Sequence, residues 1–330
     1  MSQPLVVVSY GADAAMEQAT REALGPDVEL VYSTRMSEDE RRDAITRAEA
    51  LLTWSLEHEL PEEMLEGAKE LRFLQLLSAG VDHVDLGRVP EQVVIASNVG
   101  AYAEPMAEHV MAMALSCAKR LPLRQAGLAR GEFDQRSLSL TLDGAVCGIV
   151  GFGGIGKATA RLMRAFGAEI WAINTSGSTD EPVSFVGTMS DLDRVFAGSD
   201  VLVLSVPLKR STHGLISAHE LSLMKPTAIL VNVARGEIVD QRALYEHLKA
   251  NPECWAAIDT WWDEPAVRRA FRTDYPFLEL PNVIGSPHNS PLVASGITHA
   301  VQCAAQNVRR YLDGAEPAGI VRREEYVEEG

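Results

Sequence analysis

The chain has 330 residues, 46% of them hydrophobic and 23% charged, which is typical of a folded globular protein long enough for two domains. Its formal net charge of −16 argues against nucleic acid or an anionic membrane as a partner. No apolar stretch is long enough to cross a membrane, and the N-terminus lacks the basic start of a secretory signal. Because the four cysteines are scattered, we expect a cytoplasmic protein without disulfides or a metal site.

Residues 1–98 alternate short apolar segments with amphipathic ones. We predict strands at Leu5–Ser9, Val28–Tyr32, Ala50–Trp54, Arg72–Leu77 and Val93–Ala96, and helices at Asp13–Ala23, Glu38–Arg47 and Pro61–Lys69. This alternation predicts a parallel sheet covered by helices on both faces. No glycine-rich turn follows the first strand, so we do not expect this sheet to hold a dinucleotide.

A loop, a long helix and a polar connection link the two halves of the chain. Ser78-Ala-Gly-Val-Asp-His83 follows a strand end, where ligand loops of open α/β sheets lie. We predict a helix at Pro105–Arg120 that bridges the domains, and a polar connection at Gly127–Thr141. That helix contains His109, which we interpret as a structural histidine because buried polar side chains commonly satisfy local hydrogen bonds.

The segment from Ala145 to Gly156, Ala-Val-Cys-Gly-Ile-Val-Gly-Phe-Gly-Gly-Ile-Gly, is an apolar strand that runs into a glycine-rich turn and then a helix. The pattern G-x-G-x-x-G in this context indicates a dinucleotide site. Gly151 would permit the tight turn, Gly153 the approach of a pyrophosphate, and Gly156 the packing of helix on strand. The N-terminus of the helix offers unpaired N–H groups to the phosphates.

Five further strands complete the second unit. We predict them at Ile170–Ile173, Val201–Ser205, Ile229–Val233, Ala256–Asp259 and Val283–Gly285, with helices at Met189–Phe196, Ala218–Leu223 and Gln241–Lys249. Six strands make a full dinucleotide-binding sheet. The last helix, Thr298–Leu312, has no strand after it and can fold back onto the first unit. We therefore expect one domain built from residues 1–98 and 291–330, interrupted by a dinucleotide-binding domain at 99–290.

Arg235, Glu264 and His288 each follow a predicted strand of the second unit, so they can converge at one edge of the sheet, beside a bound nicotinamide. An arginine binds a carboxylate through two parallel hydrogen bonds and stays charged. A histidine exchanges protons near neutral pH, and a neighbouring carboxylate orients its ring. These residue types suit the reduction of a 2-oxo acid.

Taken together, these motifs resemble the D-isomer-specific 2-hydroxyacid dehydrogenase family over nearly the whole chain. The motifs are Ser78-Ala-Gly-Val-Asp82, Asn98-x-Gly100, Ala107-Glu-His109, Gly151–Gly156, Val233-Ala-Arg-Gly236 with Asp240, Asp259, Glu264-Pro265 and Ser286-Pro-His288. The resemblance implies an α/β fold in which a Rossmann domain is inserted into a flavodoxin-like substrate domain. It also implies an NAD(P)-dependent enzyme for a small 2-oxo acid and its D-2-hydroxy acid, such as hydroxypyruvate or glyoxylate, and a homodimer through the cofactor domain.

The resemblance assigns individual roles. Arg235 would clamp the substrate carboxylate, His288 would be the acid/base, and Glu264 its partner. Asp259 would contact the nicotinamide carboxamide, and the backbone of Ala79, Gly80 and Val81 would complete the carboxylate site. The cofactor-binding residues are expected to be Gly151, Gly153, Gly154, Ile155, Gly156, Asn174, Thr175, Ser176, Val206, Pro207, Thr212, Val233, Ala234, Asp259 and His288.

The choice between NAD and NADP depends on the segment Asn174-Thr-Ser-Gly177 at the end of the second strand of this unit. An NAD-specific site would have a carboxylate here to bind the ribose 2′-hydroxyl, and none is present. No arginine is present either, although Lys209 and Arg210 on a neighbouring loop could reach a 2′-phosphate. We expect NADP to be accepted at least as well as NAD.

Three points are open from the sequence. Trp261 and Trp262 would either form an apolar wall beside the site or pack the domain cleft. The segment Ala266–Leu280 would be either a loop over the cleft or a partner contact. A non-catalytic dinucleotide-sensing protein on the same fold is the alternative function, although the Arg235, Glu264 and His288 set favours an enzyme.

Overall fold

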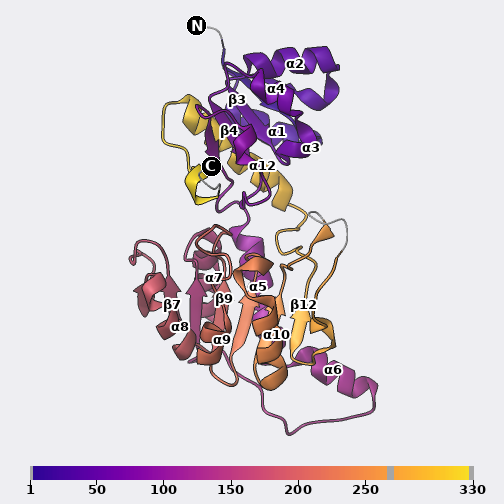
Figure 1. The fold of residues 1–330 in the computed structure, drawn as a ribbon, viewed down its shortest axis with the longest axis vertical. Helices are drawn as coiled ribbons and strands as arrows, with labels where there is room; N and C mark the ends of the chain where they lie inside the picture. The colour runs from indigo at the N-terminus through magenta and orange to yellow at the C-terminus, as the bar shows by residue number, and fades with distance from the viewer. Residues whose placement is uncertain (1–2, 266–270, 327–330) are drawn as a thin grey trace. The chain divides into compact units, whose positions relative to one another are not determined.

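The computed structural model describes residues 3–265 and 271–326, and the chain forms two compact units. The first unit comprises residues up to Tyr102 and those from Leu292 on, and the second comprises Ala103–Pro291. Each unit is built around one parallel sheet with helices packed on it (Figure 1).

The first sheet has five parallel strands in the order β2-β1-β3-β4-β5. They are β1 Leu5–Val8, β2 Glu29–Tyr32, β3 Ala50–Thr53, β4 Phe73–Leu76 and β5 Val94–Ala96. Every strand lies within one residue of its predicted ends. Every residue of β1, β3 and β4 is buried, which explains why these strands are continuous apolar runs without alternation. This strand order is that of flavodoxin-like sheets, so the predicted class is confirmed.

The helices of this unit are α1 Ala14–Leu24, α2 Glu38–Arg47, α3 Leu56–Glu59, α4 Glu62–Glu66 and α12 Gly296–Leu312, with 3-10 turns at Ser33–Arg35, Leu86–Arg88 and Arg323–Glu325. Two of these helices, α1 and α2, begin at side-chain caps. The Asp13 side chain caps α1 by accepting from the N–H of Met16, and Ser37 and Glu40 form a capping box on α2. The predicted helix Pro61–Lys69 was too long, and α3 was missed because one helical turn carries no periodic pattern.

Helix α12 comes from the C-terminal part of the chain and packs against α1 and β4. The amide of Asn307 donates to Gln75 of β4 over 2.7 Å, and the ring of Tyr311 stacks on Phe73 with centroids 4.5 Å apart. Both contacts join α12 to the sheet of the first unit, so this unit is assembled from two distant parts of the chain.

Glu59 occupies the carboxyl ends of β1 and β3, where the strand order of the first sheet reverses direction. Its carboxylate accepts hydrogen bonds from Ser9 Oγ at 2.7 Å, Thr53 Oγ1 at 2.8 Å, Trp54 N at 3.1 Å and Ser55 N at 3.0 Å. Open α/β sheets usually bind their ligand at this position. Here the position holds an anionic side chain that is already supplied with donors.

The second sheet has seven parallel strands in the order β12-β11-β10-β9-β6-β7-β8. They are β6 Val146–Val150, β7 Glu169–Ile173, β8 Phe185–Gly187, β9 Val201–Leu204, β10 Ile229–Asn232, β11 Trp255–Ile258 and β12 Val283–Gly285. The prediction of six strands was wrong by one. Strand β8 is a short edge strand in a segment rich in serine, proline and glycine, so its apolar pattern is too brief to detect. The strand order is that of a Rossmann sheet, as predicted.

The helices of this unit are α5 Ala103–Ala118, α6 Leu121–Ala129, α7 Gly154–Ala165, α8 Leu192–Gly198, α9 Ala218–Leu223 and α10 Gln241–Ala250. Turns of 3-10 helix lie at Met189–Asp191, Gly236–Ile238 and Phe277–Glu279. The predicted helix Pro105–Arg120 ends at Ala118, and the predicted polar connection from Gly127 begins within α6. Arg120 has φ +51°, and this left-handed residue separates the two helices.

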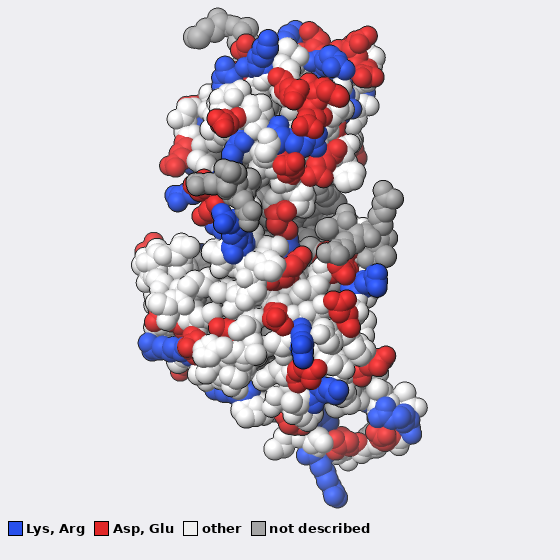
Figure 2. All heavy atoms as spheres, in the orientation of Figure 1, with Lys and Arg blue, Asp and Glu red and all other residues white. Residues whose placement is uncertain are grey.

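Within the described residues, no helix combines the length and apolarity that a membrane span requires. Figure 2 shows acidic side chains over the α2 and α4 end of the first unit, where both helices carry acidic first turns. Glutamates and aspartates in first turns stabilise the positive ends of helix dipoles, so part of the negative charge of the chain has this local role.

Candidate active site

The glycine turn follows β6, an inner strand of the second sheet that lies between β9 and β7. Gly151 has φ +101°, and a Cβ there would lie 2.6 Å from the main chain of Ser205 and Val206. A Cβ on Gly156 would lie 2.4 Å from the carbonyl oxygen of Gly151. A Cβ on Gly153 would meet nothing within 4 Å. Two glycines are therefore required by the fold, whereas the third borders open space.

This arrangement fits the pyrophosphate of a dinucleotide. Helix α7 begins at Gly154, so its N-terminal N–H groups lie at the glycine turn. Arg164 lies in the last turn of this helix, at the other end. The open space beside Gly153 lies at that helix end and would admit a phosphate group without moving the main chain. Ser205 Oγ donates to the carbonyl of Gly151 over 2.8 Å and ties the turn to the end of β9.

The predicted adenosine end is a compact loop after β7. The Asn174 side chain accepts from Gly177 N at 2.7 Å and donates to the Ser178 carbonyl at 2.8 Å. The hydroxyl of Ser176 also bonds to Asn174, at 3.2 Å, and Thr175 is exposed. Asn174 and Ser176 both take part in closing the loop, and Thr175 presents an exposed hydroxyl beside them.

Strands β10, β11 and β12 are neighbours and lie in register, with Asn232 opposite Ile258 and Ile258 opposite Gly285. The loops that carry Arg235, Glu264 and His288 therefore leave the sheet at the same edge. The Asn232 side chain accepts from Ala234 N at 3.0 Å and donates to the Arg235 carbonyl at 2.9 Å, which fixes the turn that carries Arg235.

The structure brings Glu264 and His288 together. His288 Nδ1 lies 2.6 Å from Glu264 Oε2, and Glu264 Oε1 accepts from Trp261 N over 2.8 Å. Burial by itself raises the pKa of Glu264, but the hydrogen bonds from His288 and Trp261 and the charges of His288 and Arg235 outweigh it, so this pKa lies below its ordinary value. The pair is a carboxylate that orients an imidazole through Nδ1.

His288 has an unusual backbone, with φ +50° in the left-handed region. A residue with a side chain adopts this conformation only where its surroundings hold it. The carbonyl of Asp259 accepts from His288 N over 2.8 Å. The Asp259 carboxylate accepts from Ser286 Oγ at 2.5 Å, Asn289 N at 3.2 Å and Ser290 N at 3.3 Å. Asp259 is fully buried and holds the His288 loop on both sides.

His109 joins this group from helix α5. Its Nε2 lies 2.9 Å from Ser286 Oγ and 3.6 Å from Asp259 Oδ1. His109 was expected to be structural, but its partner Ser286 was not predicted. A hydroxyl residue two positions before the predicted acid/base, at the end of a strand, is the signal that could have identified Ser286.

Trp261 belongs to the core of the second unit, and the partly buried Trp262 packs against that core. Trp261 is 5% exposed, and its indole N–H donates to the Ser286 carbonyl over 2.9 Å. Trp262 stacks on Phe277 and donates to the Val239 carbonyl over 2.8 Å. Packing within the unit therefore accounts for both side chains. Of the segment Ala266–Leu280, residues 266–270 lie outside the described residues.

The remaining predicted binding residues lie in short loops. Thr212 Oγ1 donates to the Pro207 carbonyl over 2.7 Å and accepts from Lys209 N over 2.8 Å, which closes the loop after β9 next to Val206. Val233 and Ala234 lie in the turn after β10 and are buried.

In the first unit, the loop that contains Ala79, Gly80 and Val81 is anchored from Asn98. Asn98 N donates to the Ser78 carbonyl over 2.9 Å, and its side chain donates to the Leu77 carbonyl over 3.2 Å. Among the described residues, the N–H groups of Gly80 and Val81 have no hydrogen-bond acceptor.

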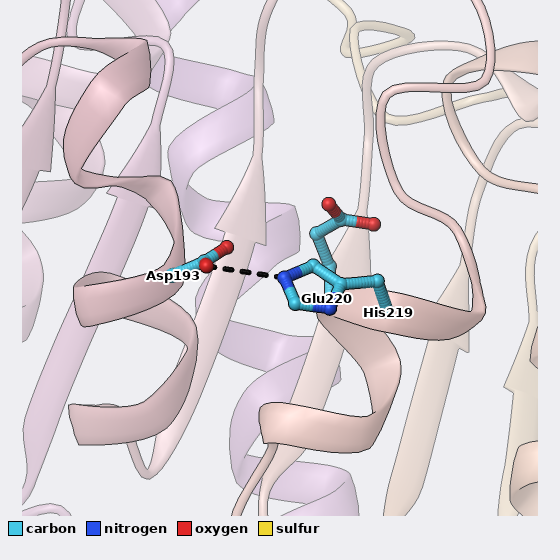
Figure 3. A group of neighbouring side chains, drawn as sticks. All are labelled: Asp193, His219 and Glu220. Atoms are coloured by element: carbon cyan, nitrogen blue, oxygen red, sulfur yellow. Dashed lines mark hydrogen bonds and ion pairs between the residues drawn. The ribbon is translucent and has the colours of Figure 1, made fainter.

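Asp193, His219 and Glu220 form a surface group on helices α8 and α9, with possible ligand atoms within 4.8 Å of one another (Figure 3). His219 Nε2 bonds to Asp193 Oδ2 at 3.1 Å, and this bond raises the pKa of His219. Glu220 accepts from the N–H and hydroxyl of Ser217 as part of a capping box. An ion pair and a helix cap explain the arrangement, so we assign no metal to it.

Comparisons with known proteins identify relatives of this chain. A sequence profile described as "D-isomer specific 2-hydroxyacid dehydrogenase, NAD binding domain" matches residues 111–290. A hydroxypyruvate reductase of Thermotoga maritima is 30% identical over 279 residues, which is 84% of this chain and 89% of that protein. The chain belongs to the D-isomer-specific 2-hydroxyacid dehydrogenase family, as the resemblance implied.

Other relatives show how the family varies. A D-3-phosphoglycerate dehydrogenase of Methanocaldococcus jannaschii is 30% identical over 89% of this chain, but the match spans only 55% of that longer protein. The crystal structure of a D-lactate dehydrogenase from Aquifex aeolicus, complexed with NAD and lactic acid, is 27% identical with a TM-score of 0.70. It covers 94% of this chain, and the match includes 96% of that structure.

Substitution of two glycines in the turn separates fold from binding. Gly156→Ala should destabilise the protein by about 2 kcal/mol or more, because its methyl group would meet a main-chain oxygen that cannot move aside. Gly153→Ala should fold with less than about 1 kcal/mol lost, but should bind NADH or NADPH roughly ten-fold more weakly or worse. Denaturant unfolding and fluorescence titration measure the two effects. Wild-type affinity in Gly153→Ala would place the pyrophosphate elsewhere.

The low pKa of Glu264 predicts a pH-dependent stability. Because the folded-state pKa lies below its ordinary value, ionised Glu264 stabilises the fold above that ordinary value, and this stabilisation is lost as the pH falls through the folded-state pKa. Glu264→Gln should therefore be less stable than the wild type at pH 7, and the difference should shrink as the pH falls below 4.5 and vanish below the folded-state pKa. Urea unfolding at several pH values tests this, with exposed Glu246→Gln as control. A difference that persists unchanged into acid would contradict it.

Proposed function

We propose that this protein is an NAD(P)-dependent oxidoreductase that interconverts a small 2-oxo acid and its D-2-hydroxy acid by hydride transfer. The observation that carries the proposal is the 2.6 Å pairing of His288 Nδ1 with Glu264, at the same sheet edge as Arg235. Because Nδ1 is engaged by the carboxylate, Nε2 is the nitrogen assigned to proton exchange with substrate. Family membership supports the same reaction class.

In this mechanism a bound NAD(P)H supplies the hydride. The guanidinium of Arg235 binds the carboxylate of the 2-oxo acid and fixes the carbonyl carbon in position. His288 enters as the imidazolium and gives its Nε2 proton to the oxygen that becomes the hydroxyl group. Glu264 accepts the hydrogen bond from Nδ1 and keeps the ring in one orientation. In the reverse direction, neutral His288 takes the hydroxyl proton.

The assignment of the two ends of the dinucleotide follows from the sheet. The glycine turn follows β6, with β7 on one side and β9 to β12 on the other. We assign the nicotinamide to the side of Arg235 and His288 and the adenosine to the side of Asn174. In the first unit, the N–H groups of Gly80 and Val81 remain the predicted donors to the substrate carboxylate.

Hydroxypyruvate and glyoxylate are the substrates we propose first. The chain matches a hydroxypyruvate reductase over nearly its whole length, but spans only about half the length of the D-3-phosphoglycerate dehydrogenases it matches. A spectrophotometric screen of 2-oxo acids with NADH and NADPH tests the proposal directly. Binding of dinucleotide without oxidation by any 2-oxo acid would favour the alternative, a dinucleotide-sensing protein.

Arg235→Ala should lose about 100-fold in kcat/KM for the 2-oxo acid, because a charged pair of hydrogen bonds to its carboxylate is removed. Dinucleotide affinity should remain within about two-fold of wild type, since Arg235 is assigned to the substrate. Steady-state kinetics and a binding titration measure both, with exposed Arg242→Ala as the matched control. Unchanged turnover would mean that Arg235 is not the carboxylate clamp.

We further propose that NADP is accepted at least as well as NAD. Asn174 closes its own loop and leaves hydroxyls, with no carboxylate, beside the expected ribose. Asn174→Asp should shift the ratio of kcat/KM for NADPH to that for NADH at least about ten-fold toward NADH, because the new charge repels a 2′-phosphate. Asn174→Ser serves as the uncharged control. A strong NADH preference in the wild type would refute the proposal.

We propose a homodimer through the cofactor unit. Helix α6 and the segment after it expose apolar side chains on that unit, namely Leu121, Leu123, Leu128, Phe133 and Leu138. Phe133 is 77% and Leu138 85% exposed, which is more than a monomer usually leaves in one segment. Light scattering that gives the mass of one chain at micromolar concentration would contradict the dimer.

We also propose the cytoplasm as the location. All four cysteines are free, and burial raises the pKa of Cys117, Cys147 and Cys254 to about 12, so these thiols are protonated and unreactive. Free thiols are typical of reducing compartments. Recovery of the protein from an exported fraction of its cells would refute this proposal.

A further inference from the structure

The loop that carries His288 is connected by hydrogen bonds to helix α5, far away in the sequence. Its residues Ser286, His288, Asn289 and Ser290 all bond to Asp259, which follows β11. Ser286 in turn contacts His109 of α5. His109, Ser286 and Asp259 thus form a relay, and we use that name for these three residues below.

The chemistry of the relay fixes the direction of each hydrogen bond. An ionised carboxylate only accepts hydrogen bonds, so the Ser286 hydroxyl donates its hydrogen bond to Asp259. Because a hydroxyl has only one proton to donate, the Ser286 oxygen can act toward His109 only as an acceptor. His109 must therefore donate through Nε2, and when its ring is neutral the proton is on Nε2.

The relay acts on the part of the loop that is conformationally costly. His288 has φ +50°, which a side-chain-bearing residue rarely adopts without external support. Two main-chain amides next to it, those of Asn289 and Ser290, bond to the Asp259 carboxylate. If that carboxylate turns, these amides lose their acceptors together. His109 restrains it through Ser286 and lies only 3.6 Å from Asp259 Oδ1.

We propose that His109 is a positioning residue, which through Ser286 and Asp259 holds His288 in the left-handed conformation in which its ring pairs with Glu264. His109 is not assigned any contact with substrate. The structural claim stands on the second unit alone, whereas its kinetic consequence rests on the proposed function.

A simple packing role and the relay make different predictions for substitutions at His109. If His109 only fills space, Gln and Met should be equivalent, because both have unbranched side chains of similar length. In the relay, Gln keeps an N–H donor near the position of Nε2, and Met has none. His109→Gln and His109→Met are therefore a matched pair that differs in the donor.

The first experiment does not depend on activity. Hydrogen exchange of the amides of His288, Asn289 and Ser290 is measured in the intact wild type, His109→Gln, His109→Met and Ser286→Ala. We expect exchange in this loop to be at least about ten-fold faster in His109→Met and Ser286→Ala, and near wild type in His109→Gln. Equal exchange in the Gln and Met variants would overturn the relay.

The double variant His109→Met with Ser286→Ala guards against general destabilisation. Residues in one hydrogen-bonded chain should show no added effect on loop exchange beyond either single change. Exchange in β10 should stay at the wild-type rate in all variants that fold. Additive effects in the loop would mean that His109 and Ser286 act separately and would overturn the proposal. If His109→Met does not fold, Ser286→Ala decides alone, and wild-type loop exchange in that variant would overturn the proposal.

Kinetics then test the consequence for the proposed reaction. We expect His109→Met to lower kcat roughly ten-fold or more, since a misplaced acid/base group is costly, and His109→Gln to restore most of it. KM for the 2-oxo acid should stay near wild type, because the turn that carries Arg235 is held by Asn232 and not by the relay. If kcat fell equally in the Gln and Met variants, the positioning role of His109 would be overturned. If the wild type reduced no 2-oxo acid, the proposed function would fail, and the exchange data would still decide the relay.

Discussion

The buried carboxylate of Asp259 is the interaction on which the polar edge of the second unit depends. Asp259 is fully buried. Its carbonyl and its carboxylate oxygens accept hydrogen bonds from residues of the loop after β12. A buried charge is tolerated only when it is fully supplied with donors, so the loop and the carboxylate stabilise each other. The ring of His288 meets Glu264 because its backbone has first been fixed by Asp259.

Two other constraints make this arrangement possible. The register of β10, β11 and β12 brings the loops with Arg235, Glu264 and His288 to one level of the sheet. The bare Cα atoms of Gly151 and Gly156 allow the turn after β6 to approach the end of β9 and the start of α7. One constraint organises the proposed catalytic groups, and the other organises the proposed pyrophosphate site. Both constraints are properties of the main chain.

The sequence was sufficient for most of the fold and for the contact between Glu264 and His288. Buried parallel strands such as β1, β3 and β9 are uninterrupted apolar runs, so their limits could be predicted closely. The edge strand β8 and the single-turn helix α3 escaped detection, since neither is long enough for a period to develop. Helix α6 also escaped detection, although the predicted helix Pro105–Arg120 ended at the left-handed residue that separates α5 from α6.

Within the site, the pairing of Glu264 with His288 could be expected from residue types and family motifs. The link from His109 to Ser286 could not, because it joins residues 177 positions apart whose contact depends on how α5 packs beside β11. The left-handed backbone of His288 was equally hidden, since even histidine, which is enriched at positive φ, adopts it in only a minority of cases. Patterns along a chain indicate periodic elements, whereas these contacts follow from tertiary packing.

Glu59 gives the first unit a different electrostatic character from the second, although both are open parallel sheets. At the reversal point of one sheet the chain presents glycines and a helix N-terminus, and at the other it presents a carboxylate satisfied by Ser9, Thr53 and the main chain. A phosphate would be attracted to the first arrangement and repelled by the second. The carboxylate of Glu59 thus adds to the lack of a glycine-rich turn after β1, and both make the end of the first sheet an unfavourable place for a dinucleotide phosphate.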